Sequence, residues 1–154
     1  QHLELVHQGL KHKRGQIFVA APPFIDRTGS LKVNSSYHAC GHQEAGGEKV
    51  ALEEVTTIET HIFDCISGFL SSLKRSNLLD DTIVLIMGSF SHPGRHSREF
   101  TPTVLAGGGF KHQGIVECRH TYRLSHLYVS ILHQMGIDVV EFATFKGNLD
   151  RVIA

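Results

Sequence analysis

The sequence has few cysteines, no net charge and no long apolar run, and each shortage excludes a class of protein. The three cysteines, Cys40, Cys65 and Cys118, form no CxxC pair, and their odd number argues against a full disulfide framework. Fifteen basic residues balance fifteen acidic ones, so no net field favours nucleic acid or acidic lipid. No apolar run is long enough to cross a bilayer, and no signal-peptide pattern is present. We therefore expect a protein without a membrane span and without nucleic acid as a partner.

Length and composition favour one compact globular domain. The chain has 154 residues, of which 41% are hydrophobic and 19% charged. It contains no internal repeat and no clear domain boundary, so we predict a single domain over residues 1–154. Because the first residue is Gln1 rather than Met, we expect a processed or truncated chain, the C-terminal portion of a larger domain.

The helices are predicted from apolar residues that recur every three or four positions. This spacing is clearest over residues 48–75, which indicates one long amphipathic helix. Residues 124–135 predict a second helix, ended by Gly136, and residues 2–14 a weaker one. Cys65 falls on the apolar side of the long helix, where we expect it to pack as a small hydrophobe.

Short apolar runs predict the strands, which are residues 16–21, 82–87, 103–106 and 113–119. The run at 82–87 is apolar without alternation, which is typical of a strand covered on both faces in a parallel sheet. The order of strands and helices predicts an α/β fold with a layered, mostly parallel sheet and flanking helices. Gly107, Gly108 and Gly109 lack the spacing and the lysine of a phosphate loop, so we expect tight backbone packing there.

Three histidines point to chemistry. His38 and His42 lie one helical turn apart in a long irregular stretch, and His96 lies in the loop between two predicted strands. Neutral imidazole is the commonest protein ligand of zinc-like cations, so we predict a divalent metal, for example zinc, bound by these three. Three imidazoles would leave an open coordination position for water or substrate. With twelve histidines in the chain, chance spacing of ordinary histidines stays an open alternative.

Other residues are weaker candidates. Arg95 and Arg98 flank His96 and are predicted to hold an anionic substrate, with solvated surface arginines as the alternative. Asp26 is a candidate carboxylate ligand or partner of a ligand. Cys40, between the first two histidines, is either a metal ligand or an ordinary loop cysteine.

Several motifs occur in an order that resembles a known superfamily. They are His38-Ala39-Cys40-Gly41-His42-Gln43, Asp81-Thr82-Ile83-Val84-Leu85-Ile86-Met87-Gly88, Arg95-His96, Thr103-Val104-Leu105-Ala106-Gly107-Gly108-Gly109, and Leu124-Ser125-His126-Leu127-Tyr128 running to Met135-Gly136. This order resembles the C-terminal half of the alkaline-phosphatase-like superfamily. Within it, the chain is most similar to a bacterial family of unknown function that is named after its HXXSHH motif. The resemblance covers roughly residues 36–149.

The resemblance implies an alkaline-phosphatase-like fold in which His38, His42 and His96 occupy one metal position. The chain departs from the motif at Gly41, where the family has serine, and at Gln43, where it has histidine. Ser89-Phe90 stands where metal-dependent members carry an Asp-His pair. One metal position is therefore retained and its neighbour lost. The superfamily's nucleophile belongs to an N-terminal half that this chain does not contain, so no catalytic residue is named.

Two functions remain open on these grounds. One is a metal-dependent, phosphoesterase- or sulfatase-like hydrolase with a reduced metal site. The other is a non-catalytic subunit that keeps the fold for assembly or interaction. An extracytoplasmic location is implied by the resemblance. A parallel sheet that lacks half its strands would expose an apolar edge, so we expect a covalent N-terminal half or a bound polypeptide in a homo- or hetero-oligomer.

Overall fold

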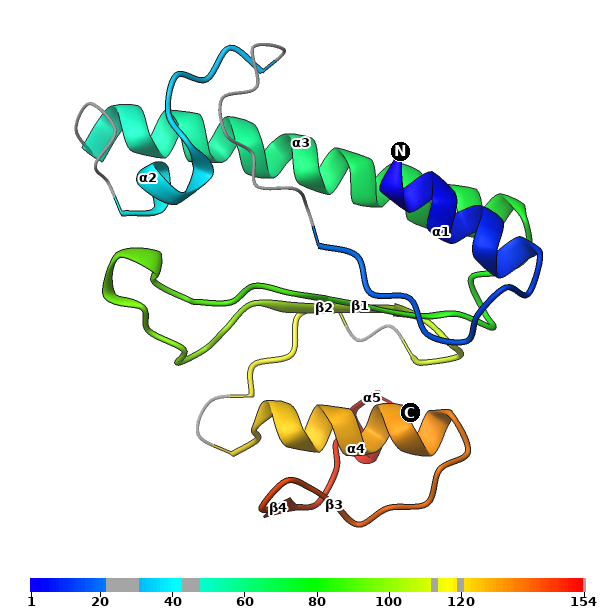
Figure 1. Ribbon diagram of the computed structural model, residues 1–154. Coiled ribbons are helices and arrows are strands. Elements are labelled where there is room, and N and C mark those ends of the chain that lie inside the picture. The colour runs from blue at the N-terminus through cyan, green and yellow to red at the C-terminus, as the bar shows by residue number, and fades with distance from the viewer. Residues whose placement is uncertain (22–30, 43–47, 112–113, 119–120, 154) are drawn as a thin grey trace. The chain divides into compact units, whose positions relative to one another are not determined.

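The computed structural model describes residues 1–21, 31–42, 48–111, 114–118 and 121–153 (Figure 1). Two compact units form. We call Gln1–Leu78 with Ser89–Glu99 the helical unit, and Leu79–Gly88 with Phe100–Ala154 the hairpin unit. Because two compact units can belong to one domain, the single domain over residues 1–154 stays a prediction.

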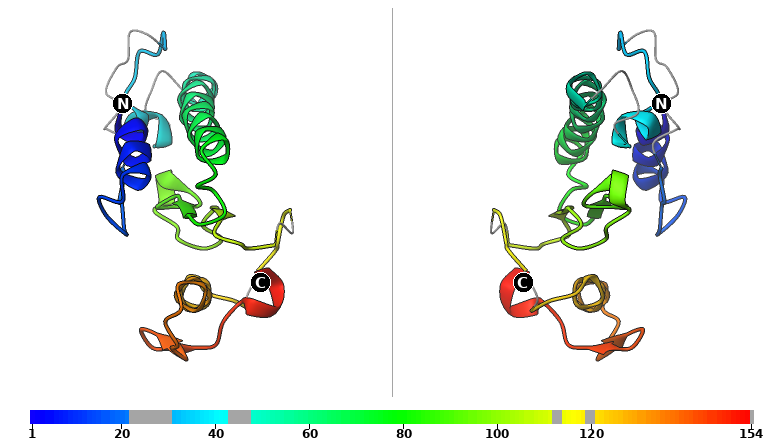
Figure 2. Two further views of the ribbon diagram at one scale, coloured as in Figure 1. Left: turned by 90° about the vertical axis from the view of Figure 1, so that its right-hand side faces the viewer. Right: turned by 90° about the vertical axis from the view of Figure 1, so that its left-hand side faces the viewer.

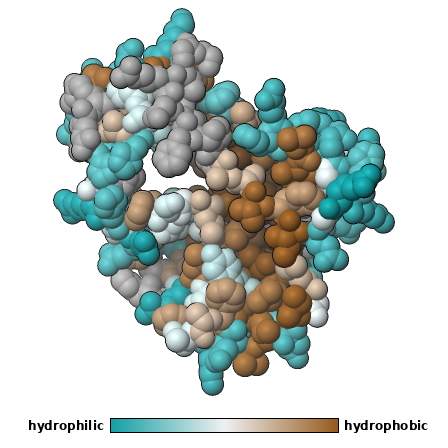
Figure 3. Space-filling model, viewed as in Figure 1, coloured by the Kyte–Doolittle hydropathy of each residue, from teal (hydrophilic) through white to brown (hydrophobic). Residues whose placement is uncertain are grey.

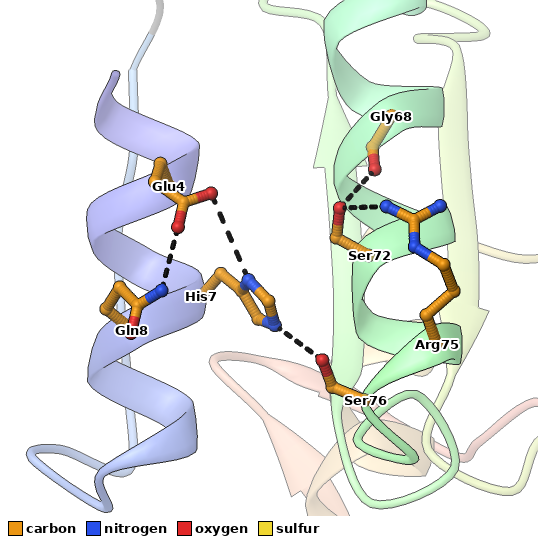
Figure 4. Close-up of polar contacts among 7 residues, drawn as sticks. All are labelled: Glu4, His7, Gln8, Gly68, Ser72, Arg75 and Ser76. Atoms are coloured by element: carbon orange, nitrogen blue, oxygen red, sulfur yellow. Dashed lines mark hydrogen bonds and ion pairs between the residues drawn. The ribbon is translucent and has the colours of Figure 1, made fainter.

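The helical unit contains α1 (His2–Lys11), α2 (Tyr37–Gly41) and α3 (Glu48–Arg75). The long helix predicted over residues 48–75 is confirmed, and so is the N-terminal helix. The α1 and α3 helices meet through a polar contact, in which His7 Nε2 lies 3.0 Å from the Ser76 hydroxyl (Figure 4). Glu4 lies one turn before His7 on α1, and its carboxylate is 4.0 Å from the imidazole.

The hairpin unit contains two short sheets and two helices. Strands β1 (Ile83–Met87) and β2 (Thr103–Gly107) pair antiparallel, from Ile83 opposite Gly107 to Met87 opposite Thr103. Helix α4 (Leu124–Gln134) follows, as predicted, and packs against β3 (Glu141–Phe142) and β4 (Phe145–Lys146). Helix α5 (Asp150–Ile153) comes last.

The predicted layered, mostly parallel sheet is wrong. Within the described residues the strands form only two-stranded antiparallel sheets. Parallel strands need a crossover that is usually a helix, but the connection from β1 to β2 holds a single 3-10 turn, η1 (Pro93–Arg95). The strand therefore returns beside its predecessor. For residues 82–87 and 103–106 the apolar runs predicted strands correctly but left their pairing undetermined.

Two other predicted strands do not form. Residues 16–21 belong to no element, and Val19 is 93% exposed. Residues 114–118, the described part of the predicted strand over 113–119, are also outside any element. Cys65 is exposed on α3 beside His61, so its expected packing in a core is wrong as well. In residues 16–21 and 114–118, apolar composition alone did not predict a strand correctly, because no described strand pairs with either segment.

The cores are small and much apolar surface stays exposed. Buried apolar side chains are Val33, Cys40, Ala51, Ile58 and Leu73 in the helical unit and Phe110, Leu127, Val129 and Leu149 in the hairpin unit. Hydrophobic side chains also remain on the visible surface in the space-filling view (Figure 3). On α3 alone, Val50, Leu52 and Phe63 are exposed.

The end of β2 shows the tight backbone packing that the three glycines predict. Gly107 has a φ of +69°, and a Cβ there would lie 2.3 Å from the Thr82 carbonyl oxygen and 2.4 Å from that of Leu79. The next residue, Gly108, donates its N–H to the same Leu79 oxygen at 3.0 Å. A side chain at position 107 is therefore excluded by both backbone conformation and space.

We predict that Gly107→Ala destabilises the protein much more than Gly136→Ala. Both glycines have positive φ, but a Cβ at Gly136 would meet no atom within 4 Å. The left-handed conformation alone costs alanine about 1 kcal/mol, and the overpacking at position 107 adds about 2 kcal/mol. Urea unfolding of the two variants measures the difference. Equal free energies of unfolding would show that the space around Gly107 is not restrictive.

Candidate functional site

Of the three predicted metal-binding histidines, His38 lies on α2 and His42 is the residue that caps its C-terminus. The Ser36 hydroxyl caps this helix by accepting the Ala39 N–H at 3.1 Å. His42 ends it and donates its own N–H to the His38 carbonyl at 3.2 Å. The spacing of four residues places the two side chains on one face of the helix. Their ring centres are 4.6 Å apart.

The loop between β1 and β2, which carries His96, lies beside α2 (Figures 1 and 2). The loop closes on itself at a bridge in which Ser97 donates its N–H to the His92 carbonyl at 3.2 Å. His96 itself has a φ of +50°, an uncommon conformation for a residue with a side chain. Its ring centre lies 5.0 Å from that of His42, with the planes at 82°.

The tip of the loop lies close to the end of α2. A Cβ at Gly94 would lie 3.6 Å from the Gly41 carbonyl oxygen at the end of the helix. The tip of the loop is thus in van der Waals range of the α2 backbone, which places His96 near His42. Segments separated by about fifty residues along the chain therefore contribute to one cluster, which we call the histidine cluster (His38, His42 and His96).

The distances between the rings suit two histidines that bind the same metal ion, but the three histidines together do not form a complete group of ligands. Two imidazoles on one tetrahedral zinc have ring centres roughly 5 Å apart, close to both separations that His42 makes. Among the residues that the structure describes, however, no three His, Cys, Asp or Glu side chains form a group that could hold a metal ion. The geometry thus fits two pairs that share His42, and the three-ligand site stays a prediction.

The surroundings of His96 are aromatic and basic. The Phe90 ring centre lies 5.1 Å from that of His96, and the Arg98 guanidinium carbon lies 5.8 Å from the Phe90 ring centre. Arg95 is exposed, and its backbone N–H donates to Nδ1 of His92 at 3.2 Å. His92 therefore uses one ring nitrogen to shape the loop. The substrate-binding roles of Arg95 and Arg98 stay predictions.

A buried carboxylate that the sequence interpretation missed attaches α2 to α3. Glu54 on α3 accepts the backbone N–H of Asn34 at 2.8 Å and that of Ser35 at 3.1 Å. It also accepts the Cys40 thiol at 3.7 Å. The signal was available, because position 54 lies on the apolar stripe of the long helix, between Ala51 and Ile58.

These contacts shift two ionisation equilibria. Hydrogen bonds from the Asn34 backbone and the Ser35 side chain, strongest first, and weaker ones from the Ser35 backbone and Cys40, lower the pKa of Glu54 against the opposing effect of burial. Burial, reinforced by the neighbouring Glu54 charge, raises the pKa of the Cys40 thiol. Cys40 is therefore a protonated donor to Glu54, and its predicted alternative role as a metal ligand loses support.

A second hydrogen bond joins the same helices. The Tyr37 hydroxyl donates to Glu59 at 3.0 Å. Burial, followed by this bond to a carboxylate, raises the pKa of Tyr37 to about 12. Two carboxylates, one helical turn or so apart on α3, thus hold the segment that carries His38 and His42.

Two predicted or motif positions, Asp26 and Gln43, lie outside the described residues. No helix in the described part of the chain is both long and apolar enough to span a membrane. Comparisons with family models, curated proteins and solved structures found no match. The resemblance to the HXXSHH family therefore stays a prediction, as do the extracytoplasmic location and the missing N-terminal half that it implies.

We predict that Glu54→Gln lowers the melting temperature by roughly 5–10 °C. An amide has a single acceptor oxygen and would turn N–H donors toward the backbone N–H groups of Asn34 and Ser35. Glu53→Gln is the matched control, because Glu53 is exposed and makes only a 4.0 Å contact with Lys49. Equal melting temperatures for the two variants would contradict the role of Glu54.

The same pair of variants makes a pH prediction. Because the folded pKa of Glu54 lies below its ordinary value of 4.5, its stabilising effect is present above that pH. The effect is lost as the pH falls through the folded pKa. The melting temperatures of wild type and Glu54→Gln are therefore expected to converge under acid, while Glu53→Gln follows the wild type throughout.

Proposed function

We propose that the helical unit binds a divalent transition-metal ion through His38, His42 and His96 and serves hydrolysis of an anionic ester. One observation carries the proposal: the His42 ring lies 4.6 Å from the His38 ring and 5.0 Å from the His96 ring, centre to centre. Proximity of rings from two separate segments, the end of α2 and the loop before β2, favours a shared ligand over chance spacing.

The donor type selects the kind of ion. Imidazole nitrogens suit zinc, copper, nickel and iron, whereas magnesium and calcium prefer carboxylate and carbonyl oxygens. His38 and His96 are exposed and His42 is half-buried, so water and substrate have access to the rings. A divalent ion there would supply Lewis acidity toward a phosphoryl or sulfuryl oxygen and would make water more acidic.

The neighbouring residues have the chemistry to bind an anion. Arg95 and Arg98 carry positive charge on either side of His96, and guanidinium groups match the paired oxygens of phosphate and sulfate. Phe90 supports the Arg98 guanidinium through its ring face and forms an apolar wall beside His96. These roles favour an anionic substrate, a phosphate or sulfate ester, over a neutral ester.

A non-catalytic subunit is the second candidate, and the exposed apolar side chains favour it. Leu52 is 63% exposed and Phe63 53% exposed on α3, and apolar side chains left in water are the kind that a partner surface can cover. The described residues also lack a complete three-ligand group. In this second proposal another polypeptide covers these side chains, and any ion that the histidines bind has a structural role.

We predict that the full chain binds one Zn²⁺ and that His42→Ala weakens the binding by at least ~100-fold. His38→Ala and His96→Ala each leave His42 with one neighbouring histidine ring and are expected to weaken binding less, by ~10-fold or more. Isothermal titration calorimetry measures the affinities. His12→Ala is the control for loss of an exposed histidine, and His61→Ala tests the pair that His61 forms with Cys65. Wild-type affinity in His42→Ala would rule out the site.

Hydrolysis of p-nitrophenyl phosphate and p-nitrophenyl sulfate separates the two functions. The hydrolase proposal predicts turnover that requires added metal, is lost in His42→Ala and is reduced about 10-fold or more in Arg95→Ala or Arg98→Ala. Metal binding without turnover would favour the structural ion of the non-catalytic subunit.

A further inference from the structure

His133 on α4 lies between two hydrogen-bond acceptors. Its Nδ1 is 2.7 Å from the Asp150 carboxylate at the start of α5. Its Nε2 is 2.6 Å from the Val139 carbonyl oxygen, in the segment before β3. The imidazole is half-buried. Its two contacts connect three parts of the hairpin unit, which are α4, the segment before β3 and the start of α5.

Both contacts require a proton on the ring nitrogen. A carbonyl oxygen and an ionised carboxylate only accept hydrogen bonds, so each nitrogen of His133 must donate. Only the imidazolium form has two donors. His126, two turns earlier on the same helix, contrasts with it, since its Nδ1 accepts the Arg123 N–H at 2.8 Å and its Nε2 lies 3.0 Å from the Lys146 carbonyl. That arrangement is satisfied by a neutral ring.

The Asp150 carboxylate is itself held in place. The buried Ser130 hydroxyl hydrogen-bonds Asp150 and accepts the Leu149 N–H at 2.7 Å. At the far end of α5, Ile153 accepts the Lys111 N–H through its carbonyl oxygen at 3.0 Å. The contacts of α5 with α4 thus centre on Ser130, His133 and Asp150.

The charges around His133 favour its protonated form. Asp150 on α5 and Asp138 in the turn after α4 both face it, and both are acidic. On the small sheet that packs against α4, Glu141 and Lys146 pair with each other at 4.0 Å. The hydrogen bond to Asp150 and then that to Val139 raise the pKa of His133. Burial opposes the shift at Asp150, but its bonds from Ser130 and His133 lower its pKa overall.

We propose that His133 is a protonation-controlled latch that holds α5 and the Val139 segment on α4 while it is an imidazolium. Loss of the proton leaves a lone pair facing an acceptor oxygen on one side, so one of the two contacts must break. The Asp150 contact also loses its opposite charge at that point. The latch therefore opens as the medium becomes alkaline.

The direction of the pH effect follows from the two shifts. The raised pKa of His133 means that its stabilising effect is complete below the ordinary value of 6.5 and is lost as the pH rises through the folded pKa. The lowered pKa of Asp150 means that its effect is present above 3.8 and is lost under stronger acid. The latch is closed between these limits.

A histidine titration followed by NMR in the full chain tests the latch. The ring ¹⁵N signals of His133 are expected to show both nitrogens protonated at pH 6.5, with a titration midpoint above that of a free histidine. Asp150→Asn should lower this midpoint by about one pH unit, whereas Glu141→Gln, which removes an acidic group of the neighbouring sheet, should leave it unchanged.

The amide of Ile153 reports the opening itself. Its signal in the wild type is expected to shift with the same midpoint as the His133 ring. A His133 ring that is neutral at pH 6.5 would overturn the proposal, and this reading needs no variant. An unchanged midpoint in Asp150→Asn, with the protein folded, would overturn it equally.

Discussion

The arrangement of the helical unit depends on the buried Glu54 carboxylate. A helix of five residues such as α2 has too few internal hydrogen bonds to be stable alone, so its position must come from tertiary contacts. Glu54 supplies them by accepting two backbone N–H groups just before α2 and the Cys40 thiol within it. Burying this charge is favourable only because all three donors satisfy it.

The functional proposal rests on that attachment. Once α2 is held on α3, the spacing of His38 and His42 brings their rings together on one face. The loop that carries His96 adds the third ring, at the cost of a left-handed backbone at His96 itself.

Part of this structure was predictable from the sequence. The helices over residues 48–75 and 124–135 were found because their apolar spacing is regular, and Asn77, two residues after the end of the first, adopts positive φ. The strands at 82–87 and 103–106 were also found, but their antiparallel pairing was not. Five apolar residues in a row are compatible with a parallel sheet or a hairpin, and only the connection between them decides.

The sequence predicted the three histidines of the candidate site but not Glu54, the residue that supports them. The convergence of the three histidines followed from the order of motifs, not from any local rule. Glu54 was overlooked because a single carboxylate on an apolar stripe reads as an interruption of the pattern, although a buried charge is more informative than a buried leucine. The strand predicted over residues 16–21 was wrong for a different reason. Its apolar residues have no partner strand and stay exposed.

X-ray absorption spectroscopy of the zinc-loaded full chain tests the central claim most directly, because it counts the atoms around the ion. The account predicts three imidazole nitrogens at about 2.0 Å, completed by oxygen, with no sulfur. A sulfur neighbour would instead show that a cysteine binds the ion, for example Cys65, which lies 3.8 Å from His61 on α3, or Cys40. That result, or a shell without imidazole, would contradict the histidine cluster as the metal site.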